Sequence, residues 1–253
     1  MSERPTQPIR IAAAGDIHAR ESRREQVIEA FAGLGEDLDL ILLAGDLTST
    51  GTPEEARIVA DACAMVAAPV YAVLGNHDWH RDDAEGVIAA LERGGVRVLR
   101  GDSAVERCGG REVGIVGTKG FVGGFAGSHI PDFGEPSLRR LFAETGREVE
   151  AIDRGLREVE QCPIRIVLLH YSPVPETLAG ERPEIRAFLG TDRLAAPIAA
   201  REPDLVLHGH AHYGDLEGAI GATPVYNVSV PVIGRDFWTV ELEAPARPVE
   251  PIH

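Results

Sequence analysis

Apolar runs and amphipathic stretches alternate through the first hundred residues of the chain. The apolar runs, which are typical of buried strands, cover 9–16, 38–46 and 69–78. The amphipathic stretches, which have the spacing of helices, cover 22–34, 53–67 and 82–95. This order of strand and helix predicts parallel strands in a layered α/β fold.

The rest of the chain combines further strand patterns with one long helix. Strand-like runs occur at 96–99, 103–108, 112–118, 164–173, 203–210, 216–220, 223–230 and 235–242. A stripe of apolar residues from Leu138 to Val159 predicts a long helix that packs against the core, and a shorter helix is expected near 191–201. Two stretches, 119–136 and 171–190, have no regular pattern and are interpreted as loops at the rim of a site, or as plain surface loops.

Five of the apolar runs end in side chains that can bind a metal ion. These side chains are Asp16 and His18, Asp46, Asn76, His170, and His210 with His212. One Asp or Asn after a strand is typically a turn residue or a helix cap, and one His is typically part of the core. Candidate ligands at five strand ends instead predict a shared site, because ligands bind beyond the carboxyl ends of parallel strands.

The chemical types of these side chains restrict which metal ions could bind. Imidazole, carboxylate and amide groups without a thiolate suit Mn, Fe, Zn, Co or Ni better than a structural zinc held by cysteine. The set of seven exceeds what one ion needs, whereas two divalent ions that share a bridging carboxylate would use all seven.

Composition predicts one globular domain. The chain has 253 residues, of which 44% are hydrophobic and 26% charged, enough to bury a core without disulfides or a structural metal. No repeat, coiled coil or linker divides it, so we expect a single domain over 1–253, with a folded core at 8–242 and a mobile tail at 243–253.

Charge and cysteine usage restrict partners and compartment. A net charge of -15 argues against nucleic acid and anionic membrane as partners, although bound cations would still admit a small anionic substrate. The three cysteines, Cys63, Cys108 and Cys162, have no CxxC spacing, and no signal or transmembrane run is present. These features predict a cytoplasmic protein with reduced thiols, and none of them indicates an oligomeric state.

The order D-x-H, GD, GNH[D/E], H and GHxH resembles the calcineurin-like metallophosphoesterases. The five blocks run from Asp16 to His212, so the resemblance covers most of the chain. It implies a four-layered α/β/β/α sandwich with mixed sheets and a binuclear metal centre. In that centre Asp46 would bridge two ions, of which one is also held by Asp16, His18 and His212, and the other by Asn76, His170 and His210.

The same resemblance assigns catalysis to His77. This side chain would not bind metal but would lie over the substrate phosphate, with Asn76 beside it, and would protonate the leaving oxygen or stabilise charge in the transition state. A packing role for His77 is the alternative. The implied reaction is in-line attack of a metal-bound hydroxide on the phosphorus of a small phosphodiester or phosphomonoester.

One departure from the family pattern narrows the activity. Members that act on phosphoproteins carry GDxxDRG, whereas Ser49 stands here at the second Asp and no Arg-Gly follows. The sequence therefore favours the bacterial phosphodiesterase or phosphohydrolase branch over a protein phosphatase. The alternatives are a non-catalytic scaffold and a nuclease of the same fold; the acidic chain argues against a nuclease.

Four residues near the motifs have two interpretations each. Arg20 and His80 either contact phosphate or lie on the solvated surface. Asp78 either orients a neighbouring residue or caps a helix that begins near Asp82. His208 ends a buried strand and is expected in the core or behind the ligands.

Overall fold

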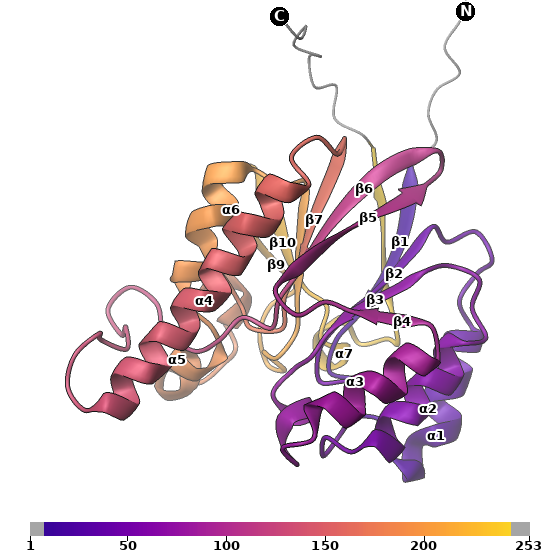
Figure 1. Ribbon diagram of the computed structural model, residues 1–253, viewed down its shortest axis with the longest axis horizontal. Coiled ribbons are helices and arrows are strands. Elements are labelled where there is room, and N and C mark those ends of the chain that lie inside the picture. Colours follow the sequence, from indigo (N-terminus) through magenta and orange to yellow (C-terminus); the bar gives the residue numbers. More distant parts are fainter. Residues whose placement is uncertain (1–7, 244–253) are drawn as a thin grey trace, which may run out of the picture.

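Two β-sheets pack face to face and carry helices on their outer sides (Figure 1). The computed structural model describes residues 8–243, so all of the predicted tail except Glu243 lies outside the described residues. The four layers confirm the predicted α/β/β/α sandwich with mixed sheets.

The first sheet has the strand order β11-β1-β2-β3-β4. Its strands are β1 (Ile9–Ala14), β2 (Leu40–Ala44), β3 (Val70–Val73), β4 (Val96–Val98) and β11 (Trp238–Leu242). The strands β1 to β3 are parallel, as predicted, β4 is parallel to β3 as well, and β11 is antiparallel to β1 at the edge.

The second sheet has the order β5-β6-β7-β8-β10-β9. Its strands are β5 (Asp102–Cys108), β6 (Arg111–Gly117), β7 (Ile164–Leu168), β8 (Leu205–His208), β9 (Glu217–Ile220) and β10 (Thr223–Asn227). Its four inner strands are parallel, and both edge strands are antiparallel to their neighbours.

Helices cover both outer faces. The first sheet carries α1 (Arg24–Ala32), α2 (Pro53–Cys63) and α3 (Ala84–Arg93), and the second carries α4 (Pro136–Glu158) and α6 (Ala195–Arg201). The short helices are α5 (Arg186–Leu189) and α7 (Val230–Ile233). In the part of the chain described, no helix is both long and apolar enough to span a membrane.

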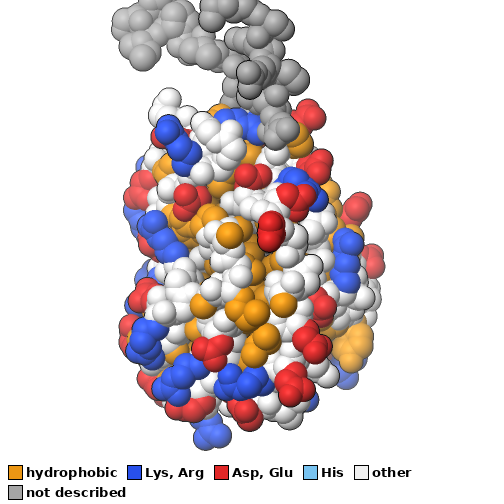
Figure 2. All heavy atoms as spheres, turned by 90° about the vertical axis from the view of Figure 1, so that its right-hand side faces the viewer, with side chains coloured by type: hydrophobic (Ala, Val, Ile, Leu, Met, Phe, Trp, Pro, Cys, Tyr) orange, Lys and Arg blue, Asp and Glu red, His pale blue; other side chains and the backbone are white. Residues whose placement is uncertain are grey.

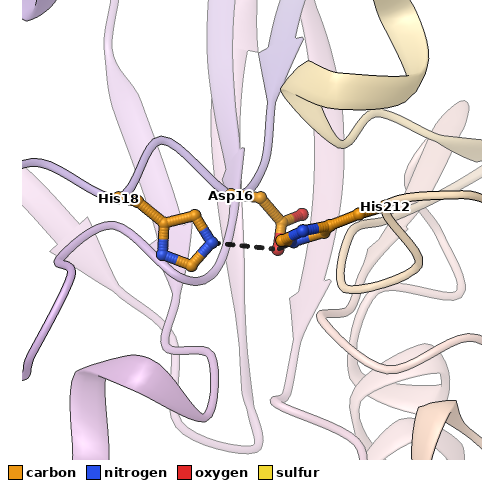
Figure 3. A group of neighbouring side chains, drawn as sticks. All are labelled: Asp16, His18 and His212. Carbon is orange, nitrogen blue, oxygen red and sulfur yellow. Dashed lines mark hydrogen bonds and ion pairs between the residues drawn. The ribbon is translucent and has the colours of Figure 1, made fainter.

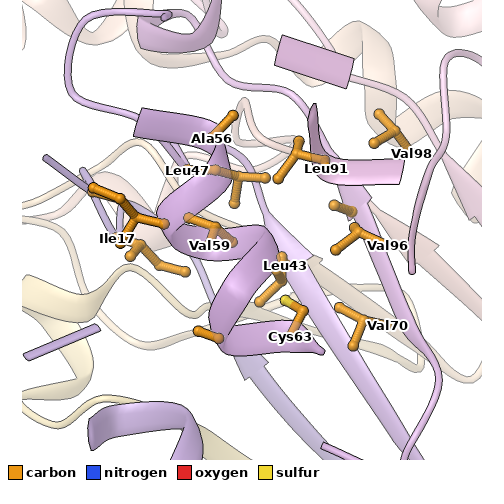
Figure 4. Close-up of a cluster of buried hydrophobic side chains, with 14 of the residues drawn as sticks. Ile17, Leu43, Leu47, Ala56, Val59, Cys63, Val70, Leu91, Val96 and Val98 are labelled. Carbon is orange, nitrogen blue, oxygen red and sulfur yellow. The ribbon is translucent and has the colours of Figure 1, made fainter. Parts of the chain in front are cut away.

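Alternation along the strands separates three apolar cores. In β1, Ile11 and Ala13 face the second sheet, whereas Ala12 and Ala14 face the helices. The core below α1 to α3 is shown in Figure 4. Because inner strands are buried on both faces, they read as continuous apolar runs in the sequence.

Two segments differ from the sequence prediction. The strand expected over 223–230 ends at Asn227, and α7 begins at Val230 with Pro231 in its first turn, where the missing N–H costs nothing. The stretch 171–190 contains α5 and two turns of 3₁₀ helix, at Glu176–Leu178 and Pro183–Ile185. These elements are too short for a periodic pattern to reveal.

Candidate metal centre

The loops after β1 and β8 bring together the first group of predicted ligands. The Nε2 atom of His212 lies 2.9 Å from Oδ1 of Asp16, and Nε2 of His18 lies 4.0 Å from the same oxygen (Figure 3). One ligand atom from each of the three side chains lies within 4.8 Å of the others. Asp16 is 2% exposed, so this carboxylate meets its neighbours inside the protein.

The loops after β2, β3, β7 and β8 form a second group beside the first. Ligand atoms of Asp46, His170 and His210 lie within 4.8 Å of one another. The Oδ1 atom of Asn76 lies 3.0 Å from Nε2 of His170, and Oδ1 of Asp46 lies 3.4 Å from that nitrogen. The other oxygen of Asp46 lies 3.9 Å from Nε2 of His18, so Asp46 stands between the two groups.

The protonation states of these side chains suit cation binding. Burial lowers the pKa of His18 to about 4 and that of His210 to about 3, so both imidazoles are neutral at pH 7 and can share an electron pair. Burial on its own would raise the pKa of Asp16, but the hydrogen bond and charge of His212 and the charge of His170 bring it below the usual range. Burial raises the pKa of Asp46, as expected for a carboxylate removed from water.

The backbone at these ligands adopts a conformation that side chains rarely take. Six non-glycine residues in the described range have positive φ, and four of them are predicted ligands: Asp16 at 60°, His18 at 49°, Asp46 at 51° and His210 at 72°. Such strain concentrates at functional sites, where the surrounding structure holds it in place. No sequence pattern indicated it, although Asp and His adopt positive φ more often than most other residues do.

His77 lies at the opening of the site with one ring nitrogen fixed. Its Nδ1 lies 2.8 Å from the carbonyl oxygen of Ser49 and must donate a proton to it. Its Nε2 is therefore the free nitrogen, 3.9 Å from Oδ2 of Asp46. Ser49, which stands where protein phosphatases have an aspartate, thus orients His77 through its main chain.

His77 also lies close enough to share a cation. One ligand atom from each of His18, Asp46 and His77 falls within 4.8 Å of the others, so geometry permits a metal role as well as the predicted catalytic one.

Asp78 joins the loops after β2 and β3. Its carboxylate accepts hydrogen bonds from the backbone N–H groups of Leu47, Thr48 and Gly75 and from the Thr48 hydroxyl, at 2.6 to 3.2 Å. Asp78 is fully buried, and the N-cap of α3 is Asp83. The prediction that Asp78 orients its neighbours is therefore the correct one of the two.

His208, His80 and Arg20 have different surroundings. His208 is buried, with Nδ1 2.8 Å from the Gly209 carbonyl oxygen and Nε2 2.9 Å from Oγ1 of Thr177, so it packs behind the ligands. The exposed ring of His80 lies 4.2 Å from that of His77, centroid to centroid. Arg20 is exposed before the 3₁₀ turn Glu21–Arg23.

The two stretches without a regular pattern, 119–136 and 171–190, make hydrogen bonds to the loops that carry predicted ligands. Lys119 offers its carbonyl oxygen to the N–H groups of both His170 and Tyr171, at 3.0 Å each. Glu181 accepts a 2.8 Å hydrogen bond from the N–H of Tyr213, next to His212. Sequence patterns did not indicate Thr177 and Glu181, because these residues lie among short turns with no motif around them.

The aromatic and histidine residues of the first stretch have separate positions. Phe125 is buried in a small cluster with Leu178, Leu189 and Ala211, and His129 pairs with Asp192 at 2.8 Å. Phe121 lines a cavity that also reaches Asn76. Of these three residues, Phe121 therefore lies at the cavity, whereas Phe125 and His129 do not line it.

Comparison with known proteins gives one family and a shared fold. The family model described as calcineurin-like phosphoesterase matches residues 9–214, whereas no curated protein matches the sequence. The chain resembles the crystal structure of a phosphopantetheinyl hydrolase from Mycobacterium tuberculosis, at a TM-score of 0.66 and 14% identity over 98% of this chain and 100% of that chain.

Two further solved structures share the fold. A putative 5'-nucleotidase from Staphylococcus aureus has a TM-score of 0.58 and 16% identity, over 97% of this chain and 56% of that chain. GAP50, the anchor in the inner membrane complex of Plasmodium, has a TM-score of 0.55 and 10% identity, over 89% of this chain and 72% of that chain. At these identities the likeness concerns the fold alone.

Proposed function

The chain belongs to the calcineurin-like phosphoesterase family, and we propose that it hydrolyses a small phosphodiester at the cluster of strand-end side chains. The observation that supports this most directly is the pair of ligand groups on either side of Asp46. We assign Asp16, His18, His212 and Asp46 to one ion, and Asn76, His170, His210 and Asp46 to another. Manganese or iron would suit this nitrogen and oxygen set, as would zinc, cobalt or nickel.

The donor set fits the reaction. Divalent ions held there would neutralise charge on phosphoryl oxygens and acidify a water molecule beside the phosphorus. The side chain of Asn76 adds an amide that offers oxygen to a cation and N–H to a phosphate oxygen.

His77 is proposed as the residue that completes the reaction. Because Nδ1 of His77 donates a hydrogen bond to the Ser49 carbonyl oxygen, Nε2 is the nitrogen that would give up or accept a proton during the reaction. About one third of this side chain is exposed, which leaves it accessible to a substrate. A proton delivered from Nε2 to the departing oxygen would prevent a free alkoxide from forming.

The experiment is hydrolysis of two chromogenic esters by the purified, Mn²⁺-loaded protein. We expect turnover of bis-p-nitrophenyl phosphate to exceed that of p-nitrophenyl phosphate, as the proposed diester substrate requires, and the reverse order would indicate a phosphomonoesterase instead. Hydrolysis of neither ester, at full metal content, would exclude the proposal and favour a non-catalytic scaffold of the same fold.

The His77→Ala variant tests the division of roles. We expect it to retain the wild-type metal content, measured by elemental analysis, and to lose about 10²- to 10⁴-fold in kcat, as removal of a general acid does. His80→Ala is the matched control, since it removes the adjacent exposed imidazole. Loss of metal from His77→Ala would show that His77 is a ligand instead.

A further inference from the structure

A cavity of about 490 Å³ opens beside the candidate metal centre and contains the only lysine of the sequence. Asn76, a proposed ligand, forms part of its lining, and Tyr171, the neighbour of His170, forms another part. The Tyr171 ring lies 4.5 Å from that of His210, centroid to centroid. The cavity and the metal centre therefore share walls.

The cavity walls are largely aromatic and aliphatic. Trp79 and Phe121 line it together with Tyr171, Leu74 and Leu99. Trp79 is 44% exposed, so a large flat surface is left uncovered next to the proposed active site. Aromatic faces of this kind bind flat rings by stacking.

Lys119 supplies the unused polar group of the cavity. Among the described residues, its ammonium has one hydrogen bond, 3.1 Å to the Gly120 carbonyl oxygen, which leaves two N–H donors for a ligand. The other charged side chains are already engaged: Arg100 pairs with Glu85, Glu144 with Arg147, and Glu148 accepts from Thr118 and from the N–H of Gly120.

The position of the Lys119 ammonium also argues against a positively charged ligand. Lys119 lies 4.2 Å from the ring centroid of Phe121 and 5.1 Å from that of Tyr171. The faces of Phe121 and Tyr171, which would attract a cationic group such as choline, are thus occupied by a cation already. Burial lowers the pKa of Lys119, while Glu148 and Glu144 oppose that change.

Main-chain hydrogen bonds join this part of the cavity to the candidate metal centre. The carbonyl oxygen of Lys119 accepts hydrogen bonds from His170 and Tyr171, so the residue that carries the ammonium also fixes the strand end that carries a proposed ligand. A group bound in the cavity would therefore have a set distance to a phosphate at the metal centre.

We propose that this cavity binds one ester substituent of the substrate, a flat ring with carbonyl acceptors such as a pyrimidine nucleobase. The ring would stack on Trp79, and a carbonyl oxygen would accept from Lys119. The inference rests on the proposed function, because it takes the phosphate of the same molecule to lie at Asn76 and His77.

The fluorescence of Trp79 gives a test that does not depend on turnover. Stopped-flow titrations of the Mn²⁺-loaded protein would compare thymidine 5'-monophosphate, phenyl phosphate and ribose 5-phosphate. We expect thymidine 5'-monophosphate to quench the signal and to bind at least about tenfold more tightly than ribose 5-phosphate, with phenyl phosphate between them. Trp79→Phe should abolish the quenching, and Trp238→Phe, which changes the other tryptophan of the sequence, should retain it.

The Lys119→Met variant tests the contribution of the carbonyl acceptors separately from that of ring stacking. We expect this variant to bind thymidine 5'-monophosphate about tenfold more weakly, with phenyl phosphate and ribose 5-phosphate unchanged. Arg107→Met, which removes an exposed cation on β5, should change none of the three.

Different results would overturn the proposed cavity and the proposed hydrolase function. Equal affinities of the wild-type protein for thymidine 5'-monophosphate and ribose 5-phosphate would overturn the inference, even if both chromogenic esters are hydrolysed. Conversely, quenching with the expected order of affinities but no hydrolysis would uphold the ring-binding cavity and exclude the proposed hydrolase.

Discussion

At the scale of single residues, the candidate site is built on strained backbone. Asp16, His18, Asp46 and His210 all hold positive φ, a region that costs a non-glycine residue about 1 to 3 kcal/mol. Glycine at these positions would avoid this cost, but it has no side chain that could bind a metal ion. The retained strain indicates that position and direction of the side chain matter more here than local stability, the trade-off expected at an active site.

His18 offers a measurement of this strain, because among the described residues its ring contacts its neighbours without making a hydrogen bond. We expect the metal-free His18→Gly variant to be more stable than His18→Ala by about 1 kcal/mol, since φ of 49° suits glycine. That order reverses the usual preference of about 0.5 to 1 kcal/mol for alanine in regular structure.

Urea unfolding of both variants in EDTA gives the comparison. Ala19→Gly is the control at the next position, where φ is negative, and it should destabilise the protein. If His18→Ala proves as stable as His18→Gly, the left-handed conformation at His18 carries no cost.

At the scale of elements, the strand-end loops are fixed by contacts with one another. Asp78 joins the loop after β2 to the loop after β3 through three hydrogen bonds, and the carbonyl oxygen of Lys119 binds the end of β7. The loop after β8 is held by the segment that follows β7, where Thr177 contacts His208 and Glu181 contacts Tyr213. The ends of β2 and β3, and those of β7 and β8, are therefore joined in pairs that support the ligands.

Gly180 shows how close these loops lie. A Cβ added there would collide with the carbonyl oxygen of Tyr213. We expect Gly180→Ala to displace the loop that carries His210 and His212, and to weaken Mn²⁺ binding by about tenfold or more, as a disturbed support does.

Gly146→Ala is the matched control for that change. In α4 an added methyl group would meet the flexible end of Arg193 at 3.4 Å, and alanine suits a helix better than glycine by about 0.5 to 1 kcal/mol. Isothermal titration with Mn²⁺ measures both variants. Unchanged affinity in Gly180→Ala would mean that the two loops can separate without moving the ligands.

At the scale of the whole molecule, acidic residues outnumber basic ones, and three of the acidic residues are buried at or beside the site. The chain has 40 acidic and 25 basic residues, and the buried carboxylates of Asp16, Asp46 and Asp78 lie at or beside the site. On the side of the molecule shown in Figure 2, acidic and basic side chains are interspersed and form no continuous basic band. Nucleic acid would find no basic path on that face, whereas a divalent cation would relieve the buried charge.

Mn²⁺ should therefore stabilise the entire fold. We expect the melting temperature of EDTA-treated protein to rise by roughly 5 to 10 °C at a Mn²⁺ concentration about 100 times the dissociation constant, because the ions bind the folded chain. Differential scanning calorimetry measures the shift. Asp46→Asn should lose most of it and Glu54→Gln, an exposed acid on α2, should keep it. An equal shift in Asp46→Asn would remove Asp46 from the proposed centre.

The sequence by itself determined the layered fold and the seven candidate ligands, because apolar periodicity and strand-end position are local properties of the chain. Strands buried on both faces appear as apolar runs, and each motif residue follows one of them. Tertiary structure alone decided how Asp46 stands between the two groups, that Ser49 orients His77 through its carbonyl oxygen, and that Thr177 and Glu181 support the histidine loop. It also placed Lys119 over two aromatic rings. Apart from the contact of Lys119 with Phe121, these relations join residues far apart in the chain, and spacing carries no information about contacts that form only when separate strand-end loops meet in the folded protein.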